Sequence, residues 1–264
     1  MIKKLTFSLL LNLFIIVPIH ALSLEDTTKI GMRIWHNEAS QKRDLLVFWS
    51  QYEPFPSLGI GHCIWYPQGV EPRYTQVFPE LCIYLQEHGV ILPSWLEEAK
   101  DTGAPWKSRE EFLQDKERTE ELRTLLEATI PLQTQFMIDR LEQQWPYILQ
   151  AAPLEKQEQL DYYYTLMKSS PLGTYAVVDY LNFKGNGLNP LEESNGQRWG
   201  LLQVMLDMPT GLTQENMTKA FTLSAAKILI ILVQNSAPDY RRFRYLHGWI
   251  RRISSYADES LFSN

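Results

Sequence analysis

The chain has few of the residues that build metal sites and covalent crosslinks. It contains two cysteines, Cys63 and Cys82, and neither has a second ligand at the spacing of a zinc motif. The Gly-x-Ser-x-Gly turn of serine hydrolases, the His-Glu-x-x-His motif of zinc proteases and the phosphate-binding P-loop are all missing. We therefore expect a site that uses neither a metal nor an organic cofactor.

Positive charge and long apolar runs are also scarce. Acidic residues number 31 against 25 basic ones, which gives a formal net charge of −6. A general nucleic-acid binder neutralises phosphates with Lys and Arg, so we expect no nucleic-acid partner. After the first 21 residues no apolar stretch reads as long and charge-free enough to span a bilayer. The remaining chain is expected to be soluble.

Residues 1–21 have the pattern of an export signal. Lys3 and Lys4 precede an apolar run from Leu5 to Val17, and Ala21 offers a small residue for cleavage. We expect 22–264 to be one exported domain, periplasmic or secreted, in an oxidising compartment. There the two cysteines either form a disulfide or remain as two buried thiols.

Apolar periodicity predicts a mostly helical chain with one small hairpin. A capping box at 23–26 opens a helix to about Ser40. Pro54 and Pro56 exclude a helix through 53–57, and the glycines of 57–66 stand among β-branched and aromatic residues, as in a strand. Further helices are expected at 78–88, from 109 to Pro131, from there to about Trp145, and at 154–168, 171–181, 199–207, 215–234 and 239–254. This is an α+β arrangement, with a lobe at 24–66 and a helical lobe at 78–256.

The residues with chemical content lie at 34–67. Glu38 stands near the end of the first helix beside the apolar Ile34 and Trp35, and Glu53 lies in the Pro-rich turn. A string with a hydroxyl, two glycines and a histidine follows, Ser57 to His62. Glycosidases use a pair of carboxyl groups, one as acid and one as base or nucleophile. Glycines would let a sugar ring lie against the backbone.

The string Ser57–His62 (SLGIGH) resembles the Thr-Ile-Gly-Ile-Gly-His strand of phage-type lysozymes, and the spacing around it is similar to that of bacterial chitosanases. The resemblance covers about 34–66. It implies a lysozyme-like α+β fold in which Glu38 is the general acid, Glu53 orients water and Ser57 holds that water, with His62 in support. The chain departs from the phage-type pattern in three ways: Ala39 replaces a glycine, the turn acid is Glu rather than Asp, and the interval from Glu38 to Gly59 is a few residues longer. Asp44 is the reserve candidate for the turn acid.

A second unusual stretch is the Gly- and Asn-rich segment 182–203. Its end, Gly200–Gln203 (GLLQ), resembles a string that lines the sugar cleft of lytic transglycosylases and goose-type lysozymes. The segment is either a connecting loop before a capped helix or the far wall of a cleft. Trp49 and Trp65, which flank the hairpin, are candidates for stacking on sugars. The residues expected to contact substrate are Gly59, Gly61, His62, Trp65, Asn182, Lys184, Trp199 and Gln203.

Together these features predict an exported glycoside hydrolase that cleaves β-1,4 linkages of peptidoglycan or a related amino-sugar polymer, with inversion. Two alternatives remain: a non-catalytic wall-binding protein on the same scaffold, and a lytic transglycosylase that uses Glu38 alone. The Arg-rich stretch from Arg241 to Arg252 is either a solvated helix face or a contact for an anionic surface.

Overall fold

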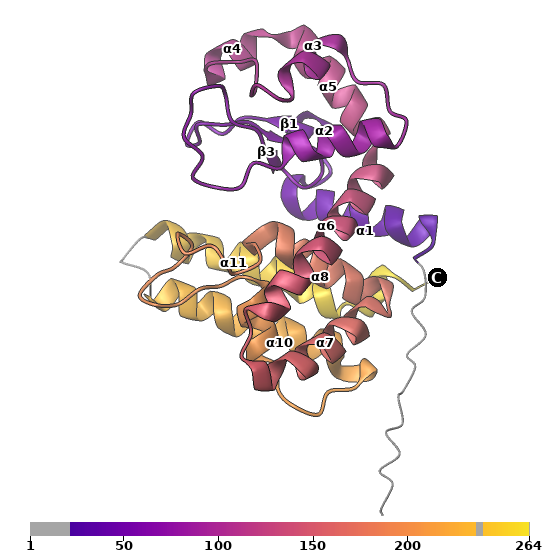
Figure 1. The fold of residues 1–264 in the computed structure, drawn as a ribbon, viewed down its shortest axis with the longest axis vertical. Coiled ribbons are helices and arrows are strands. Elements are labelled where there is room, and N and C mark those ends of the chain that lie inside the picture. The colour runs from indigo at the N-terminus through magenta and orange to yellow at the C-terminus, as the bar shows by residue number, and fades with distance from the viewer. Residues whose placement is uncertain (1–21, 236–239, 264) are drawn as a thin grey trace, which may run out of the picture.

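The computed structural model describes residues 22–235 and 240–263, so the expected export signal at 1–21 lies outside the described residues. Two groups of elements are joined by one long helix, α6 (Ile130–Gln150), as Figure 1 shows. The first group consists of η1 (Arg43–Leu46), β1 (Val47–Phe48), β2 (Ser57–Leu58), β3 (Cys63–Ile64), α2 (Phe78–Glu87), α3 (Ser94–Ala99), α4 (Arg109–Gln114) and α5 (Lys116–Ala128). The second consists of α7 (Leu154–Lys168), α8 (Pro171–Lys184), α9 (Leu201–Asp207), α10 (Gln214–Asn235), α11 (Tyr240–Ser254), η2 (Ser255–Ala257) and η3 (Glu259–Leu261).

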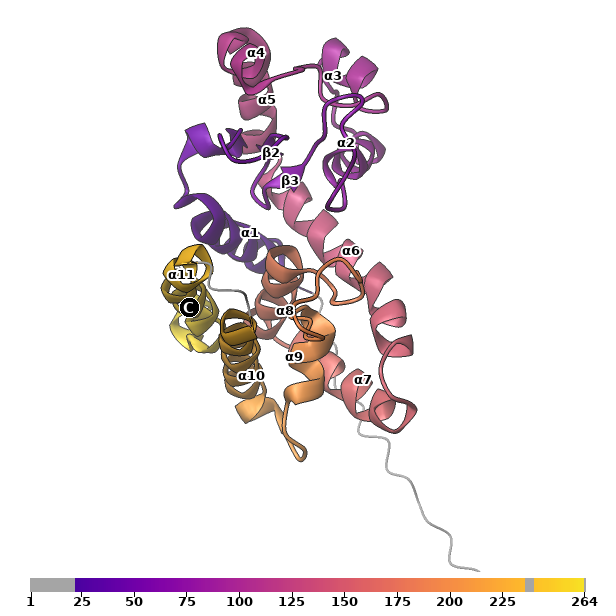
Figure 2. The same cartoon turned by 90° about the vertical axis from the view of Figure 1, so that its left-hand side faces the viewer.

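The helix α1 (Leu24–Ala39) lies between the two groups and packs against α6 and α8 (Figure 2). The expected capping box is confirmed, because Ser23 Oγ accepts from Asp26 N at 3.0 Å and Ser23 N donates to Asp26 Oδ2 at 3.2 Å. The helix ends where Ser40 takes a left-handed conformation with φ of 50°. Glu38 therefore sits in the last turn.

The sheet has three short antiparallel strands in the order β1-β2-β3. Val47 pairs with Leu58, and Ser57 pairs with Ile64. The single strand expected over 57–66 is wrong, because the chain turns back between Gly59 and His62, whose φ values are 75° and 50°. The broader expectation, a predominantly helical chain with a small antiparallel sheet, is confirmed.

Most expected helices are present within a few residues of their expected bounds. One expected helix is divided into α4 and α5, because Asp115 leaves helical geometry and caps α5 by accepting from Arg118 N at 3.1 Å. The helix α6 continues past Trp145 through Pro146, and α3 was not expected.

The division into lobes also differs from the expected one. The helices α2 to α5 lie with the sheet rather than with the later helices, so the two groups part within α6 and not between 66 and 78 (Figures 1 and 2). One continuous hydrophobic cluster nevertheless runs through both groups, from Ile30 to Tyr256. The two groups of elements therefore share one core.

The helix α10 is long and apolar enough to cross a membrane by length and composition, so the expectation that no later segment reaches that limit is wrong. Such a helix is weak evidence for a span, since core helices pass the same test. Here one face of α10, including Met217, Phe221 and Leu229, is buried, and the helix packs against α7, α8, α9 and α11.

The two cysteines are free and buried, which decides between the two alternatives in favour of separate thiols. Burial raises the pKa of the Cys63 thiol to about 12.

Candidate functional site

A cleft of about 620 Å³ opens between the sheet and the helices of the second group. Its walls come from the turn before β2, the β2–β3 turn, α6, the end of α8, the loop 185–200 and α11. Elements far apart in the sequence therefore share one concave surface. Small-molecule and glycan sites are concave in this way.

Glu38 is not among the residues that line this cleft, and its side chain is 16% exposed. Its Oε1 atom accepts hydrogen bonds from Arg252 Nη2 at 2.7 Å and from Asn182 Nδ2 at 3.2 Å. Its Oε2 atom lies 3.8 Å from Nδ1 of His62. Both Asn182 and His62 line the cleft, so they connect the carboxylate to it.

Asn182 ties three elements together at this point. Besides Glu38 of α1, its Nδ2 atom donates to the carbonyl of Gly61 in the sheet turn at 3.0 Å, while Asn182 itself belongs to α8. The His62 ring is held from its other side, because Nε2 lies 3.1 Å from the carbonyl oxygen of Leu45. The side chains around Glu38 are therefore positioned by fixed contacts.

A buried charge cluster, which the sequence did not reveal, lies behind Glu38. The fully buried Asp179 accepts from Arg252 Nε at 2.8 Å, from Arg252 Nη2 at 2.7 Å, from Tyr256 Oη at 2.5 Å and from Asn37 Nδ2 at 3.2 Å. Burial by itself would lower the pKa of the Arg252 guanidinium, but the Asp179 and Glu38 carboxylates raise it well above its ordinary value. One cation is shared by two carboxylates.

The expectation that the whole Arg-rich stretch from Arg241 to Arg252 faces outward is wrong for Arg252. Its side chain is only 8% exposed and points to Asp179 and Glu38, because these carboxylates compensate the cost of burying its charge. The sequence signal that was available is Asp179 itself, a lone acid inside the apolar run Ala176–Leu181. A buried acid of this kind requires a cationic or donor partner.

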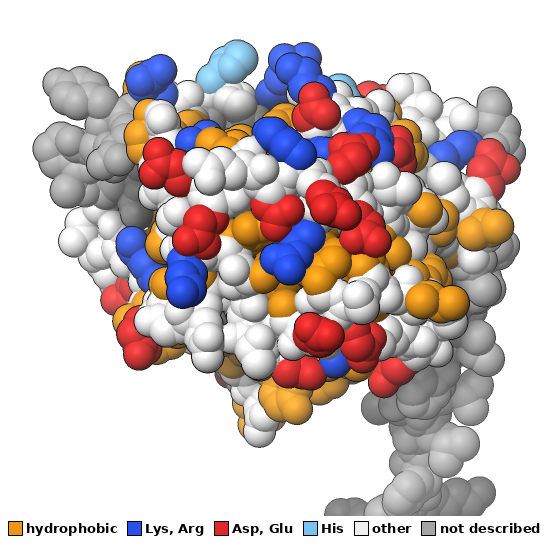
Figure 3. Space-filling view, turned by 90° about the horizontal axis from the view of Figure 1, so that it is seen from above, with side chains coloured by type: hydrophobic (Ala, Val, Ile, Leu, Met, Phe, Trp, Pro, Cys, Tyr) orange, Lys and Arg blue, Asp and Glu red, His pale blue; other side chains and the backbone are white. Residues whose placement is uncertain are grey.

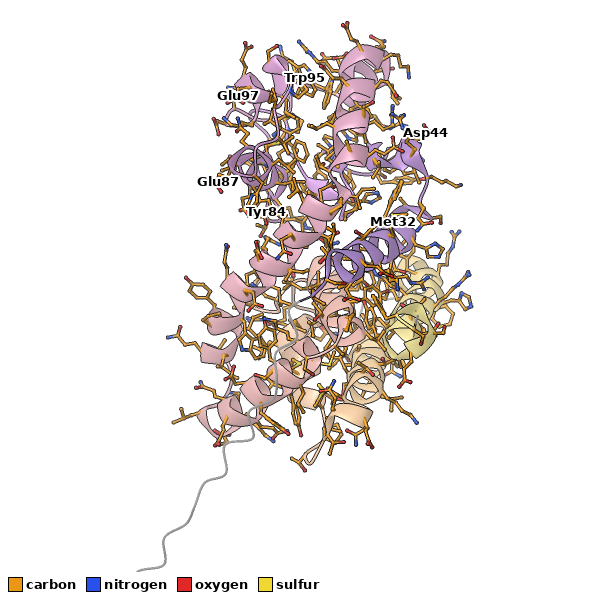
Figure 4. The ribbon with its side chains drawn as sticks, turned by 90° about the vertical axis from the view of Figure 1, so that its right-hand side faces the viewer. Met32, Asp44, Tyr84, Glu87, Trp95 and Glu97 are labelled. Carbon is orange, nitrogen blue, oxygen red and sulfur yellow. The ribbon has the colours of Figure 1, made fainter. Side chains whose placement is uncertain are left out.

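Several of the expected site residues do reach the cleft. They are Glu53, Ser57, Gly61, His62, Asn182, Lys184 and Trp199. Glu53 is exposed in its turn, whose backbone is held by a hydrogen bond from Trp49 Nε1 to the Glu53 carbonyl oxygen at 2.8 Å. The reserve candidate Asp44 lies on η1, outside the cleft lining (Figure 4).

Three other expected substrate contacts do not fit their positions. Trp65 has no exposed surface and packs against Phe78 and Trp106, so it cannot stack on a sugar. Gly59 is buried against Gln133, and Gln203 accepts from Gly200 N at 3.0 Å to cap α9. None of these three residues lines the cleft.

Trp49 is buried as well, at 4% exposure, and therefore is not available for stacking. The cleft takes its aromatic surface from elsewhere, in part from Trp199 and Trp249. Trp249 was not expected at the site. The ammonium group of Lys184 lies 3.5 Å from the Trp249 ring centroid and 4.1 Å from that of Phe183.

The segment 182–203 is both a loop that connects α8 to the capped helix α9 and a wall of the cleft. Asn182 and Lys184 belong to α8, and the loop that follows contributes Asn186, Asn189 and Glu192 to the cleft. Burial raises the pKa of Glu192, although Asn189 and the Lys184 charge oppose this shift. The charged residues of the lining are Glu53, Glu192, Arg140 and Lys184, which balance one another.

Among residues 22–235 and 240–263, no group of three or more His, Cys, Asp or Glu side chains is placed to hold a metal ion. Comparison of the chain with protein-family models, with curated proteins and with solved structures finds no match.

Proposed function

We propose that this chain is an exported, lysozyme-like glycoside hydrolase that cleaves β-1,4 linkages of peptidoglycan or a related amino-sugar polymer. The proposal rests above all on one observation: Glu38 contacts His62 and Asn182, and these two residues line the same cleft as Glu53 and Ser57. A helix-borne glutamate beside a small sheet, between two groups of helices, also agrees with the resemblance of residues 34–66 to phage-type lysozymes.

Glu38 is the general acid in this proposal. Its Oε1 atom is occupied by Arg252 and Asn182, which leaves Oε2, on the side of His62, to carry the transferred proton. Arg252 remains neutralised by Asp179 when Glu38 is protonated. Once Glu38 has given up its proton, Arg252 stabilises the carboxylate that forms. The shared cation thus suits an acid that changes charge during the reaction.

Glu53 and Ser57 would orient the attacking water on the opposite face of the sugar ring, as an inverting enzyme requires. Ser57 is held in β2 through its pairing with Ile64. The carboxamides of Asn182, Asn186 and Asn189 supply hydrogen-bonding groups along the cleft for sugar hydroxyls and acetamido groups.

The test compares Glu38→Gln with Glu25→Gln on purified peptidoglycan sacculi. Glu25 lies on the same helix and is exposed, so the control makes the same chemical change away from the cleft. We expect Glu38→Gln to lose about 10²-fold or more of fragment release, measured by mass spectrometry, and Glu25→Gln to keep it. Fragment release that persists in Glu38→Gln, with a normal melting temperature, would show that Glu38 is not the general acid.

A non-catalytic wall-binding protein is the second candidate. The buried pairing of Glu38 with Arg252 favours it, because an ion pair that stabilises the fold is reason enough for a glutamate at this position, without any catalytic role. Wild-type protein that sediments with sacculi but never releases fragments would support it. A lytic transglycosylase is the third candidate. The Glu53 carboxylate forms no hydrogen bond or ion pair to other described residues, as expected if it were dispensable. Anhydro ends in the products, and full activity of Glu53→Gln, would support this candidate.

A further inference from the structure

The helix α11 has two faces of different character. Leu246, Trp249, Ile250 and Ile253 pack inward against the hydrophobic core. Arg244, His247 and Arg251, at i, i+3 and i+7, form one stripe on the exposed side. The side chains of Arg241 and Arg242, which belong to the same Arg-rich stretch, lie outside the described set.

The stripe continues onto α1, which lies next to α11 in Figure 2. The exposed His36 ring has a lowered pKa, first because of partial burial and then because of the positive charges of Arg33 and Arg251. Charges from both helices therefore act on one imidazole. The Arg33 side chain itself turns inward to the hydroxyl of the buried Tyr175, so we call His36, Arg244, His247 and Arg251 the basic stripe.

The basic stripe has no acidic counterpart in the described part of the chain. No carboxylate of residues 22–235 or 240–263 forms an ion pair with any of its members, whereas Arg252 and Arg43 each pair with two carboxylates. Like charges that face one another repel, so this arrangement is most stable with an anion against it.

Phe243 precedes Arg244 in the chain and is 71% exposed, whereas Tyr245, 57% exposed, stacks on Trp249 of the cleft with ring centroids 6.4 Å apart. In the view of Figure 3, basic and histidine side chains gather along one edge of the molecule. Arginines interspersed with exposed aromatics are typical of helices that lie on a membrane, where the rings enter the headgroup region. A soluble phosphate polymer would use the charges but not the aromatics.

We propose that the basic stripe, with Phe243, binds an anionic phospholipid surface. This inference is independent of the proposed hydrolase activity. The inner face of the same helix carries Trp249 at the cleft and Arg252 behind Glu38. Because the stripe is on the outer face, membrane contact leaves the cleft side of α11 open to a glycan.

The experiment uses the chain from Leu22 to Asn264, which contains the whole described core, so that the apolar run of residues 5–17 does not itself enter the bilayer. Sedimentation is measured with phosphatidylcholine vesicles containing about 30% phosphatidylglycerol and with pure phosphatidylcholine vesicles, at low ionic strength. The variant is Arg244→Glu/Arg251→Glu. Its matched control is Lys107→Glu/Lys116→Glu, the same change in charge at exposed positions of the other group of elements.

We expect wild type and control to bind the anionic vesicles and not the neutral ones, and the Arg244→Glu/Arg251→Glu variant to bind at least about tenfold more weakly. Phe243→Ser should also weaken vesicle binding. The inference would be overturned if the wild-type protein did not bind anionic vesicles. It would also be overturned if both double variants lost the same amount of vesicle binding. Binding of soluble polyphosphate as strong as that of vesicles, unchanged in Phe243→Ser, would replace the lipid surface with a general anion site.

Discussion

Replacing Arg252 by methionine removes the cation that two carboxylates share. Methionine has a comparable length but no charge and no donor. Asp179, which has no exposed surface, would lose the hydrogen bonds from Nε and Nη2, and Glu38 would lose the one from Nη2. The guanidinium also lies 4.2 Å from the centroid of the Phe183 ring, a contact that methionine only partly replaces.

Breaking a buried pair by removing one partner typically costs about 3–5 kcal/mol of the free energy of unfolding, because a buried charge is left uncompensated. Asp179 keeps its hydrogen bonds from Tyr256 and Asn37, which limits the loss. In a chain of this length each kcal/mol corresponds to about 2–4 °C. We therefore expect Arg252→Met to lower the melting temperature by about 6–20 °C.

Thermal unfolding followed by circular dichroism measures this loss, and Arg43→Met is the matched control. Arg43 also pairs with two carboxylates, those of Glu120 and Glu127, but its side chain is 37% exposed. Exposed pairs contribute about 0–1 kcal/mol, so this control should change the melting temperature little. Equal small losses in both variants would refute the view that burial makes the Arg252 cluster important.

A double-mutant cycle with Asp179→Asn isolates the coupling between the two partners. Asp179→Asn/Arg252→Met buries no unpaired charge at position 179, so it should lose about 1–3 kcal/mol less than the sum of the single changes. Strictly additive losses would show that Arg252 stabilises the protein through packing alone.

Two further perturbations test the sheet and the buried thiol. Gly59→Ala should destabilise the protein by about 1–3 kcal/mol more than Gly69→Ala in urea unfolding. Both glycines have positive φ, but a Cβ at Gly59 would meet Gln133 Oε1, whereas one at Gly69 has open space; equal losses would contradict this steric reasoning. Because burial raises the pKa of Cys63 from 9.0 to about 12, the contribution of this thiol to the free energy of unfolding should be fully present below pH 9 and should fall by up to about 1.4 kcal/mol per pH unit above it. Burial also raises the pKa of Cys82, which adds to the decline. Cys63→Ala should flatten this decline, and an unchanged slope in that variant would exclude the thiol as its source.

Local patterns predicted most of the helices because helix formation depends on near neighbours. The capping box at Ser23 set the start of α1, and Gly89 follows the end of α2, as expected from helix-terminating residues. The prediction of one strand over 57–66 is wrong because strand propensity does not show where a short strand turns back. Its turn depends on Gly59, which packs against Gln133 of α6, distant in sequence.

In the candidate site, too, some residues could be predicted from local sequence and others could not. Glu38, Glu53, Ser57 and His62 lie within one short stretch, so their order could be recognised and assigned to chemistry. Trp65 belongs to the same stretch but faces the core, because the register of β3 decides which side each residue takes. No local pattern contains that information.

The sequence by itself determined the helical character of the chain, the position of Glu38 at a helix end, and the hydroxyl, glycines and histidine that follow it. The tertiary structure alone decided what surrounds Glu38. Arg252 and Asn182 reach it from α11 and α8, and Asp179 neutralises the arginine from within an apolar helix. Spacing along the chain specifies neighbours within a helix or a hairpin. Which distant charges share a buried space depends on how the helices pack, because only there does burial make every unpaired charge costly.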